Sequence, residues 1–123
     1  MTGLKVQDFH GQPVIDSRDV AHMVGRNHNE LMKTIRTYVS YLREGEIAQS
    51  DFFIPSNYIN AQNKEMPSYL ITKKGCDMIA NKTTGKKGVL FAAAYVSAFE
   101  EMRQALTAAP ARVSFPEGVY LIG

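Results

Sequence analysis

The stretch "DSRDVAHMVGRNHNELMKTIR", residues 16–36, holds a single glycine, Gly25, between two segments that each have a helical pattern. Ala21 precedes this glycine by four residues. A small residue at that spacing lets two short helices pack closely, because a bulky side chain there would push the second helix away. Glycine also adopts a positive φ without the steric cost that a side chain adds. The stretch therefore predicts a helix-turn-helix, with Val20 and Val24 at the contact between its helices.

The second helix of this motif is predicted to run from about Asn27 to about Leu42. Its apolar residues recur at positions i, i+4, i+7 and i+11 and form one stripe. The opposite side of the helix is polar and basic. In a helix-turn-helix the second helix lies in the major groove of DNA, where Asn can bind adenine and Arg or Lys can bind guanine. The apolar stripe consists of Leu31, Ile35, Tyr38 and Leu42, and the polar side of Asn29, Lys33, Arg36 and Ser40.

Two β-hairpins are predicted on either side of the helix pair. The first, "LKVQDFHGQPVID" at residues 4–16, turns at Gly11, and Ser17 after it is a predicted helix N-cap. The second, "DFFIPSNYINAQNKEMPSYLIT" at residues 51–72, turns near residues 61–65, and its prolines are typical of edge strands or bulges. This order predicts an α+β fold, a winged helix-turn-helix-like domain in which the second hairpin is the wing.

A pair of helices is predicted after the wing. The first follows Thr72, a candidate N-cap, and ends at about Lys82, and the second runs from about Lys86 to Ala105. We assign residues 1–108 to one domain and residues 109–123 to a tail that is either an added edge strand or poorly ordered. Prolines are expected to break the helix in this tail, at Pro110 and Pro116.

The last predicted helix is apolar on nearly every side, which one helix in a small domain seldom is. Either it is central to the fold, or one of its faces meets another subunit. We expect a homodimer in which Tyr95 and Phe99 anchor the contact, because aromatic residues are enriched at interface centres. The alternative is that Phe91, Tyr95 and Phe99 fill the core of the same chain.

Composition limits the cellular setting. A chain of 123 residues with 45% hydrophobic residues is expected to fold as one domain. The net charge of +2 permits a polyanionic partner without requiring one. A single cysteine, Cys76, excludes an internal disulfide and favours the reducing cytoplasm. We expect no signal peptide and no membrane span, because no apolar run is long enough.

Three lysines outside the second helix are candidate phosphate contacts. Lys64 lies at the predicted tip of the wing, and Lys86 and Lys87 lie at a predicted helix start, where the helix dipole favours anions. The alternative for each is an ordinary solvated loop. The segment "TTGKKG" lacks the earlier glycine and the Lys-Ser/Thr ending of a phosphate-binding loop that hydrolyses nucleotides.

Catalytic and metal-binding readings find little support. His10, His22, His28 and Cys76 do not have the spacing of a metal site, and no Ser/His/Asp arrangement stands out. His22 is expected to be partly buried in the first helix, and Cys76 to belong to the core. We therefore expect no enzyme activity, no cofactor and no metal ion.

The segments "SRDVAHMVGRNHNELMKTIR", "SDFFIPSNYINAQNKEMPSYLITKKGCDMIANKTTGKKG" and "FAAAYVSAFEEM" together resemble the Rha family of phage regulatory proteins. The resemblance covers about residues 14–102. It implies a phage- or prophage-encoded, non-enzymatic regulator in the cytoplasm of the bacterial host, similar in use to the N-terminal domains of antirepressors. Many relatives of this kind continue into a second C-terminal module, and we expect any function of such a module to be carried elsewhere.

Two functions compete at this stage. The first is a transcriptional regulator that binds double-stranded DNA through the helix-turn-helix. The second is an antirepressor that binds a phage repressor protein and does not need to touch DNA. Salt separates them, because contacts to DNA phosphates weaken steeply with salt and apolar protein interfaces do not. The residues predicted to contact DNA are Arg26, Asn27, His28, Asn29, Lys33, Arg36, Lys64, Lys86 and Lys87.

Overall fold

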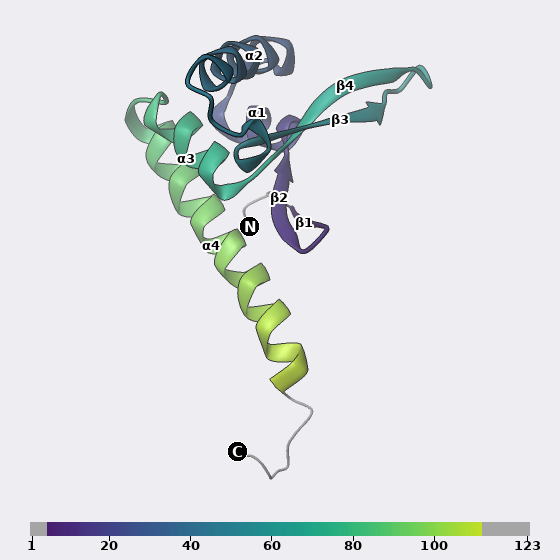
Figure 1. Ribbon diagram of the computed structural model, residues 1–123. Helices are drawn as coiled ribbons and strands as arrows, with labels where there is room; N and C mark the ends of the chain where they lie inside the picture. Colours follow the sequence, from purple (N-terminus) through teal and green to yellow (C-terminus); the bar gives the residue numbers. More distant parts are fainter. Residues whose placement is uncertain (1–4, 112–123) are drawn as a thin grey trace.

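The computed structural model describes residues 5–111 of the chain, and the side chains of residues 5–104. The fold is α+β, as the sequence predicted (Figure 1). In chain order the elements are β1 (Val6–Phe9), β2 (Gln12–Asp16), α1 (Ser17–Val24), α2 (His28–Glu44), the short 3-10 helix η1 (Gln49–Asp51), β3 (Phe53–Ile59), β4 (Glu65–Ile71), α3 (Lys73–Asn81) and α4 (Gly85–Ala111).

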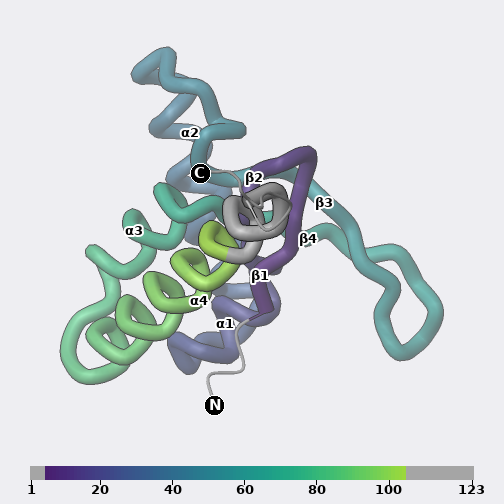
Figure 2. Tube along the Cα trace, turned by 90° about the horizontal axis from the view of Figure 1, so that it is seen from below, coloured from purple at the N-terminus to yellow at the C-terminus, as the bar shows by residue number. Residues whose placement is uncertain are grey.

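The two predicted hairpins are present, and they share one antiparallel sheet with the strand order β1-β2-β4-β3. The seam between them is short, since β2 and β4 pair only at Ile15 with Ile71 and at Asp16 with Leu70. Beyond this seam the β3–β4 hairpin projects away from the helices (Figures 1 and 2). Hydrophobic patterning predicted each hairpin but not the seam, because two residue pairs leave no recognisable sequence pattern.

The prolines of the sheet all lie outside the short seam between β2 and β4. Pro55 lies in β3, an edge strand as predicted. Pro13 and Pro67 belong to β2 and β4, which each have neighbours on both sides, but both residues lie outside the two-residue seam. Their missing N–H groups therefore leave the β2–β4 pairing intact.

Helices α1 and α2 are joined by the turn that Gly25 was predicted to form. Gly25 has φ 72° and ψ 32°, the left-handed region. Its N–H donates to the carbonyl of His22, and the N–H of Arg26 donates to the carbonyl of Ala21. This pair of hydrogen bonds is the Schellman motif, which ends a helix and satisfies its last carbonyls.

The N-cap of α1 differs from the prediction. Asp16 caps the helix, because its carboxylate accepts a hydrogen bond of 2.8 Å from the N–H of Arg18. Ser17, the predicted cap, is the first helical residue and is fully buried. The prediction was wrong because the Ser17 hydroxyl is used in tertiary contacts and is not available to cap its own helix.

The core lies between the helices and the root of the sheet. Helix α2 buries the predicted Leu31, Ile35 and Leu42, while Tyr38 is only half-buried. Cys76 is buried in α3 as predicted, and this burial raises the pKa of its thiol. Burying an aliphatic or aromatic side chain contributes about 1.5–3 kcal/mol. The prediction for His22 was wrong, because its side chain is exposed on α1.

Helix α4 is longer than predicted and is buried on one side only. Phe91, Tyr95 and Phe99 are 0%, 3% and 6% exposed and fill the core of this chain. The Tyr95 hydroxyl donates a hydrogen bond to the carboxylate of Asp77. The expectation that Tyr95 and Phe99 anchor an interface between subunits was therefore wrong. The outward side of the helix instead exposes Val89, Leu90 and Val96.

The end of α4 also departs from the prediction. Pro110 stands at the last position but one of the helix. Four of the residues from Arg103 to Ala109 are alanines or leucines, which are strong helix formers. The missing backbone N–H of Pro110 therefore did not end the helix earlier. Most of the predicted tail, including Pro116, lies outside the described residues, and the division at residue 108 stays a prediction. No helix within residues 5–111 has the length and apolar character needed to cross a membrane.

The turn can be tested by giving Gly25 a side chain. We expect Gly25→Ala to lower the free energy of unfolding by about 1–2 kcal/mol, because a Cβ is strained at positive φ. Urea denaturation measures this change. Gly45→Ala is the matched control, since Gly45 has φ −83° and a Cβ there would meet no atom closer than 3.5 Å. Equal effects of the two substitutions would contradict the turn geometry.

Candidate nucleic-acid interface

The outward face of α2 carries the predicted polar side chains, all exposed. Asn29, Lys33, Arg36 and Ser40 lie along this face. No acidic residue occurs between Leu31 and Arg43 in the sequence. Lys33 forms an ion pair of 3.5 Å with Glu30, but both side chains are more than half exposed. Such a pair contributes little, so Lys33 remains free to exchange it for another anion.

The side chains at the start of α2 divide into two groups. Asn27 is the N-cap, and its side-chain oxygen accepts a hydrogen bond of 2.8 Å from the N–H of Asn29. This hydrogen bond fixes the orientation of the Asn27 amide and takes one of the two lone pairs of its oxygen, so Asn27 is less free than Asn29 to bind adenine through both of its polar atoms. The exposed amide of Asn29 can do so, because its side chain makes no hydrogen bond to the residues that the structure describes.

His28 is placed differently from its neighbours. Its ring is half-buried and lies edge-on to the Tyr58 ring of β3, with 5.9 Å between the ring centroids. The His28 Nε2 atom forms a hydrogen bond of 2.9 Å with the buried Ser17 hydroxyl. That hydroxyl also accepts a hydrogen bond of 3.0 Å from the backbone N–H of Tyr69 in β4. His28 therefore connects α2 to α1 and to the second hairpin, a role that its sequence neighbourhood did not reveal.

A second contact between α1 and the hairpin involves Arg18. Its guanidinium donates two hydrogen bonds to the Asp16 carboxylate and lies over the Tyr58 ring, 4.1 Å from the centroid. Burial raises the pKa of Asp16, but the hydrogen bonds and charge of Arg18 outweigh it and the pKa is lowered. The carboxylate therefore stays ionised, and the sequence analysis did not single out Arg18.

The tip of the β3–β4 hairpin is built by asparagines. The Asn60 side chain accepts hydrogen bonds of 2.9 Å from the N–H groups of Gln62 and Lys64. Asn63 has φ 61°, a conformation that asparagine tolerates well. These amides therefore shape the turn, and Lys64 is exposed at the tip as predicted, away from the helices.

Lys86 and Lys87 lie in the first turn of α4, and both are exposed. Lys87 reaches the α1–α2 turn, where a Cβ on Gly25 would lie 2.6 Å from its Nζ atom. Lys87 and Arg26 line the same hollow, together with Lys82 from the end of α3. Lys86 does not line this hollow. The sequence analysis missed Lys82, although it considered the neighbouring segment "TTGKKG".

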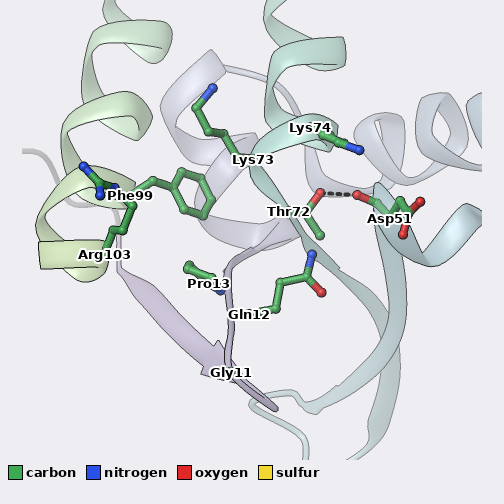
Figure 3. A pocket seen from close by; sticks show the side chains of 9 residues that line it. All are labelled: Gly11, Gln12, Pro13, Asp51, Thr72, Lys73, Lys74, Phe99 and Arg103. Atoms are coloured by element: carbon green, nitrogen blue, oxygen red, sulfur yellow. Dashed lines mark hydrogen bonds between the residues drawn. The ribbon is translucent and has the colours of Figure 1, made fainter. Parts of the chain in front are cut away.

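A second, larger cleft of about 480 Å³ lies between α4, the start of α3 and the β1–β2 turn (Figure 3). Phe99 and Pro13 form part of its apolar lining, and Lys73, Lys74 and Arg103 bring positive charge to it. The Thr72 hydroxyl, which caps α3 as predicted, donates a hydrogen bond of 2.7 Å to the carbonyl of Asp51 at its edge. Among the described residues no three His, Cys, Asp or Glu side chains gather as a metal site.

Comparison with known proteins identifies the family. Residues 15–104 match the family described as phage regulatory protein Rha. The chain belongs to this family. The SPbeta prophage-derived putative antirepressor protein YoqD of Bacillus subtilis (strain 168) is 46% identical to it over 110 residues, which are 89% of this chain and 44% of that protein.

An uncharacterized protein of Haemophilus influenzae is a more distant relative of this Rha-family chain. It is 28% identical over 103 residues, which are 84% of this chain and 58% of that protein. The chain thus spans about half the length of these two relatives. No solved structure matches it. The family resemblance read from the sequence is confirmed.

The His28 contact predicts a pH dependence of the stability of this Rha-family chain. Burial, with a smaller contribution from the charges of Arg18 and Arg36, lowers the pKa of His28 below its usual 6.5. The unfolded chain then binds the proton more tightly, so the free energy of unfolding falls as pH drops through the unfolded pKa and levels off below the folded pKa. The substitution His28→Gln should remove the part of this decrease in the free energy of unfolding that His28 causes.

Urea denaturation at about pH 7.5 and about pH 5.5 measures the effect. The matched control is His22→Gln, which changes an exposed histidine of α1. The control should retain the full decrease in stability between the two pH values. If both variants keep the decrease of the unaltered chain, His28 is not the group responsible.

Proposed function

We propose that this Rha-family chain is a DNA-binding transcriptional regulator of a phage or prophage, with α1 and α2 as its helix-turn-helix. The observation that carries the proposal is the outward face of α2, where Asn29, Lys33 and Arg36 are exposed side by side. These side chains have the chemistry that reads adenine and guanine in the major groove. Glu30 is the one acid beside these residues, and from Leu31 to Arg43 the helix carries no acidic residue, so the field along this stretch favours a polyanion.

The surrounding elements support the same proposal. The α1–α2 connection has the tight glycine turn that a helix-turn-helix requires, and the β3–β4 hairpin, whose Tyr58 contacts His28 at the start of α2, would serve as the wing. Lys64, exposed in the β3–β4 connection, would then contact a phosphate of the backbone. A regulator of this kind works in the cytoplasm of the bacterial host, on double-stranded DNA, without enzymatic chemistry or a cofactor.

The test removes the cations of α2. We expect Lys33→Ala combined with Arg36→Ala to leave the fold intact, because exposed substitutions change stability by only about 0.5 kcal/mol or less. DNA affinity should fall at least about tenfold, and the slope of log K against log salt should decrease by about 1–2. Fluorescence anisotropy with duplexes selected from phage DNA measures both.

Lys73→Ala combined with Lys74→Ala is the matched control. It removes the same charge from the start of α3, a helix that carries none of the residues predicted to contact DNA. The control should bind DNA nearly as tightly as the unaltered chain. If the Lys33 and Arg36 variant binds DNA as tightly as the unaltered chain at physiological salt, α2 is not the reading helix.

A second candidate function is an antirepressor that binds a repressor protein. The relative named as an antirepressor favours it, and so does the cleft beside Phe99, whose apolar lining and lysine neighbours suit an acidic, apolar segment of a partner. The two functions differ in salt dependence and in the surface that they use. DNA binding depends on α2, whereas repressor binding would depend on the cleft and would survive loss of Lys33 and Arg36.

We further propose that the protein acts as a homodimer through the outward side of α4. Val89, Leu90 and Val96 are 69%, 49% and 46% exposed on one side of this helix. Large apolar side chains gathered in this way are typical of a contact surface. Two copies would present two α2 helices to a two-fold related site, as helix-turn-helix dimers do.

Light scattering tests the dimer at tens of micromolar protein. The unaltered chain should have the mass of two chains. Val89→Glu combined with Val96→Glu should give a folded monomer, because buried unpaired carboxylates oppose association. Ser50→Glu, an exposed position in η1, is the control and should remain dimeric. A monomeric unaltered chain would remove the dimer, and a dimer that survives both valine changes would place the contact elsewhere.

A further inference from the structure

Three positively charged side chains from separate parts of the chain line one hollow of about 340 Å³. Arg26 comes from the α1–α2 turn, Lys82 from the residue after α3, and Lys87 from the first turn of α4. The other residues with polar side chains in its lining are Thr34, Tyr38, Thr83 and Thr84, and among the described residues the lining contains no acid. We call this hollow the basic basin. The α3–α4 connection, which contributes Thr83 and Thr84 to the basin, is the loop at the upper left of Figure 1.

The fold holds the two sides of the basic basin in place. On the α2 side, the Arg26 guanidinium donates hydrogen bonds to the Thr34 hydroxyl at 2.9 Å and to the carbonyl of Glu30 at 3.3 Å. On the α4 side, the helix backbone at Gly88 lies so close to Thr83 that a Cβ there would be 2.0 Å from the Thr83 carbonyl oxygen. The α3–α4 connection is therefore packed tightly against the first turn of α4.

The positive charge of the basic basin is not neutralised from within. Lys82 and Lys87 form no ion pair with any residue in the described part of the chain, and Arg26 donates to uncharged acceptors. The Glu30 carboxylate, which is the nearest acid along α2, is paired with Lys33. Three cations around one hollow repel one another, and an anion bound among them would relieve that repulsion.

Two further features suit an anion with several oxygens. Lys87 belongs to the first turn of α4, where the helix dipole favours negative charge. The Thr84 hydroxyl has no hydrogen-bond partner among the described residues and can donate to an oxygen. Guanidinium, ammonium and hydroxyl donors that converge on one point match the oxygens of a phosphate group.

We infer that the basic basin binds a phosphate group, through Arg26, Lys82, Lys87 and Thr84. Two sources supply this chemistry: the backbone of DNA, or a small phosphorylated compound. The DNA source rests on the proposed function, and the position of Arg26 directly before α2 favours it. A DNA phosphate bound in the basin would fix the position of α2 along the groove. It would do so without distinguishing one base sequence from another.

The first experiment titrates inorganic phosphate into the ¹⁵N-labelled full chain at constant ionic strength, with chloride as the reference salt. Saturable chemical-shift changes are expected at the amides of Gly25, Thr83, Thr84 and Lys87. Lys82→Gln combined with Lys87→Gln should abolish them. Lys73→Gln combined with Lys74→Gln removes the same charge from the other end of α3 and should not. Absence of saturable changes, or their survival in the Lys82 and Lys87 variant, would overturn the inference.

The second experiment measures binding of duplex DNA by the same variants. If DNA is the source, the Lys82 and Lys87 variant should bind at least about tenfold more weakly, with a salt slope smaller by about 2. The Lys33 and Arg36 variant should also lose DNA affinity but retain the phosphate shifts. If phosphate causes the chemical-shift changes but the Lys82 and Lys87 variant binds DNA as tightly as the unaltered chain, the ligand of the basin is a small phosphorylated compound.

The two proposals can fail separately. If the unaltered chain saturates with phosphate but does not bind DNA, the basic basin stands and the DNA-binding function falls. If DNA binding depends on Lys33 and Arg36 but phosphate causes no shift at the basin, the function stands and the basin falls.

Discussion

The buried hydroxyl of Ser17 is the contact on which the relation between helices and hairpin depends. It accepts the N–H of Tyr69 from β4, bonds His28 at the start of α2, and lies 3.8 Å from the sulfur of Met32. Without the Ser17 hydroxyl oxygen, the backbone N–H of Tyr69 would have no acceptor, and the free energy of unfolding would fall by about 1–3 kcal/mol. The outward face of α2 and the β3–β4 hairpin keep their relative positions because both are bonded to the same side chain.

The sequence was sufficient wherever structure is set by neighbours along the chain. The Ala21–Gly25 spacing predicted the turn, and Thr72 predicted the start of α3, where its hydroxyl accepts a hydrogen bond from the N–H of Gly75. The apolar stripe of α2 predicted which side of the helix is buried, and therefore that the opposite, polar side is exposed. Each of these features depends on residues within about one or two helical turns, and local propensity and patterning report that range.

The sequence was insufficient where distant segments compete for a side chain. Ser17 is a good cap by type, yet β4 claims its hydroxyl and Asp16 caps the helix instead. His28 is one of several polar residues at a helix start, and only the packing of Tyr58, thirty residues later, gives it a structural role. Lys82 joins Arg26 through the approach of two helix ends, which no spacing along the chain records.

The short seam between β2 and β4 also affects how the molecule can fit a partner. Within residues 5–111, the outer part of the β3–β4 hairpin has no third strand beside it, and a two-stranded ribbon alone is only marginally stable. At its root Leu70 and Ile71 pair with β2, and towards its outer end Arg18 and His28 lie against Tyr58, the last residue but one of β3. The ribbon is therefore held at both ends of β3, and only the connection beyond it, residues 60–64, lies past these contacts. Such a tip can adjust to different surfaces while the strands behind it keep their place, and the entropy lost when the tip becomes ordered would weaken loose complexes more than well-matched ones.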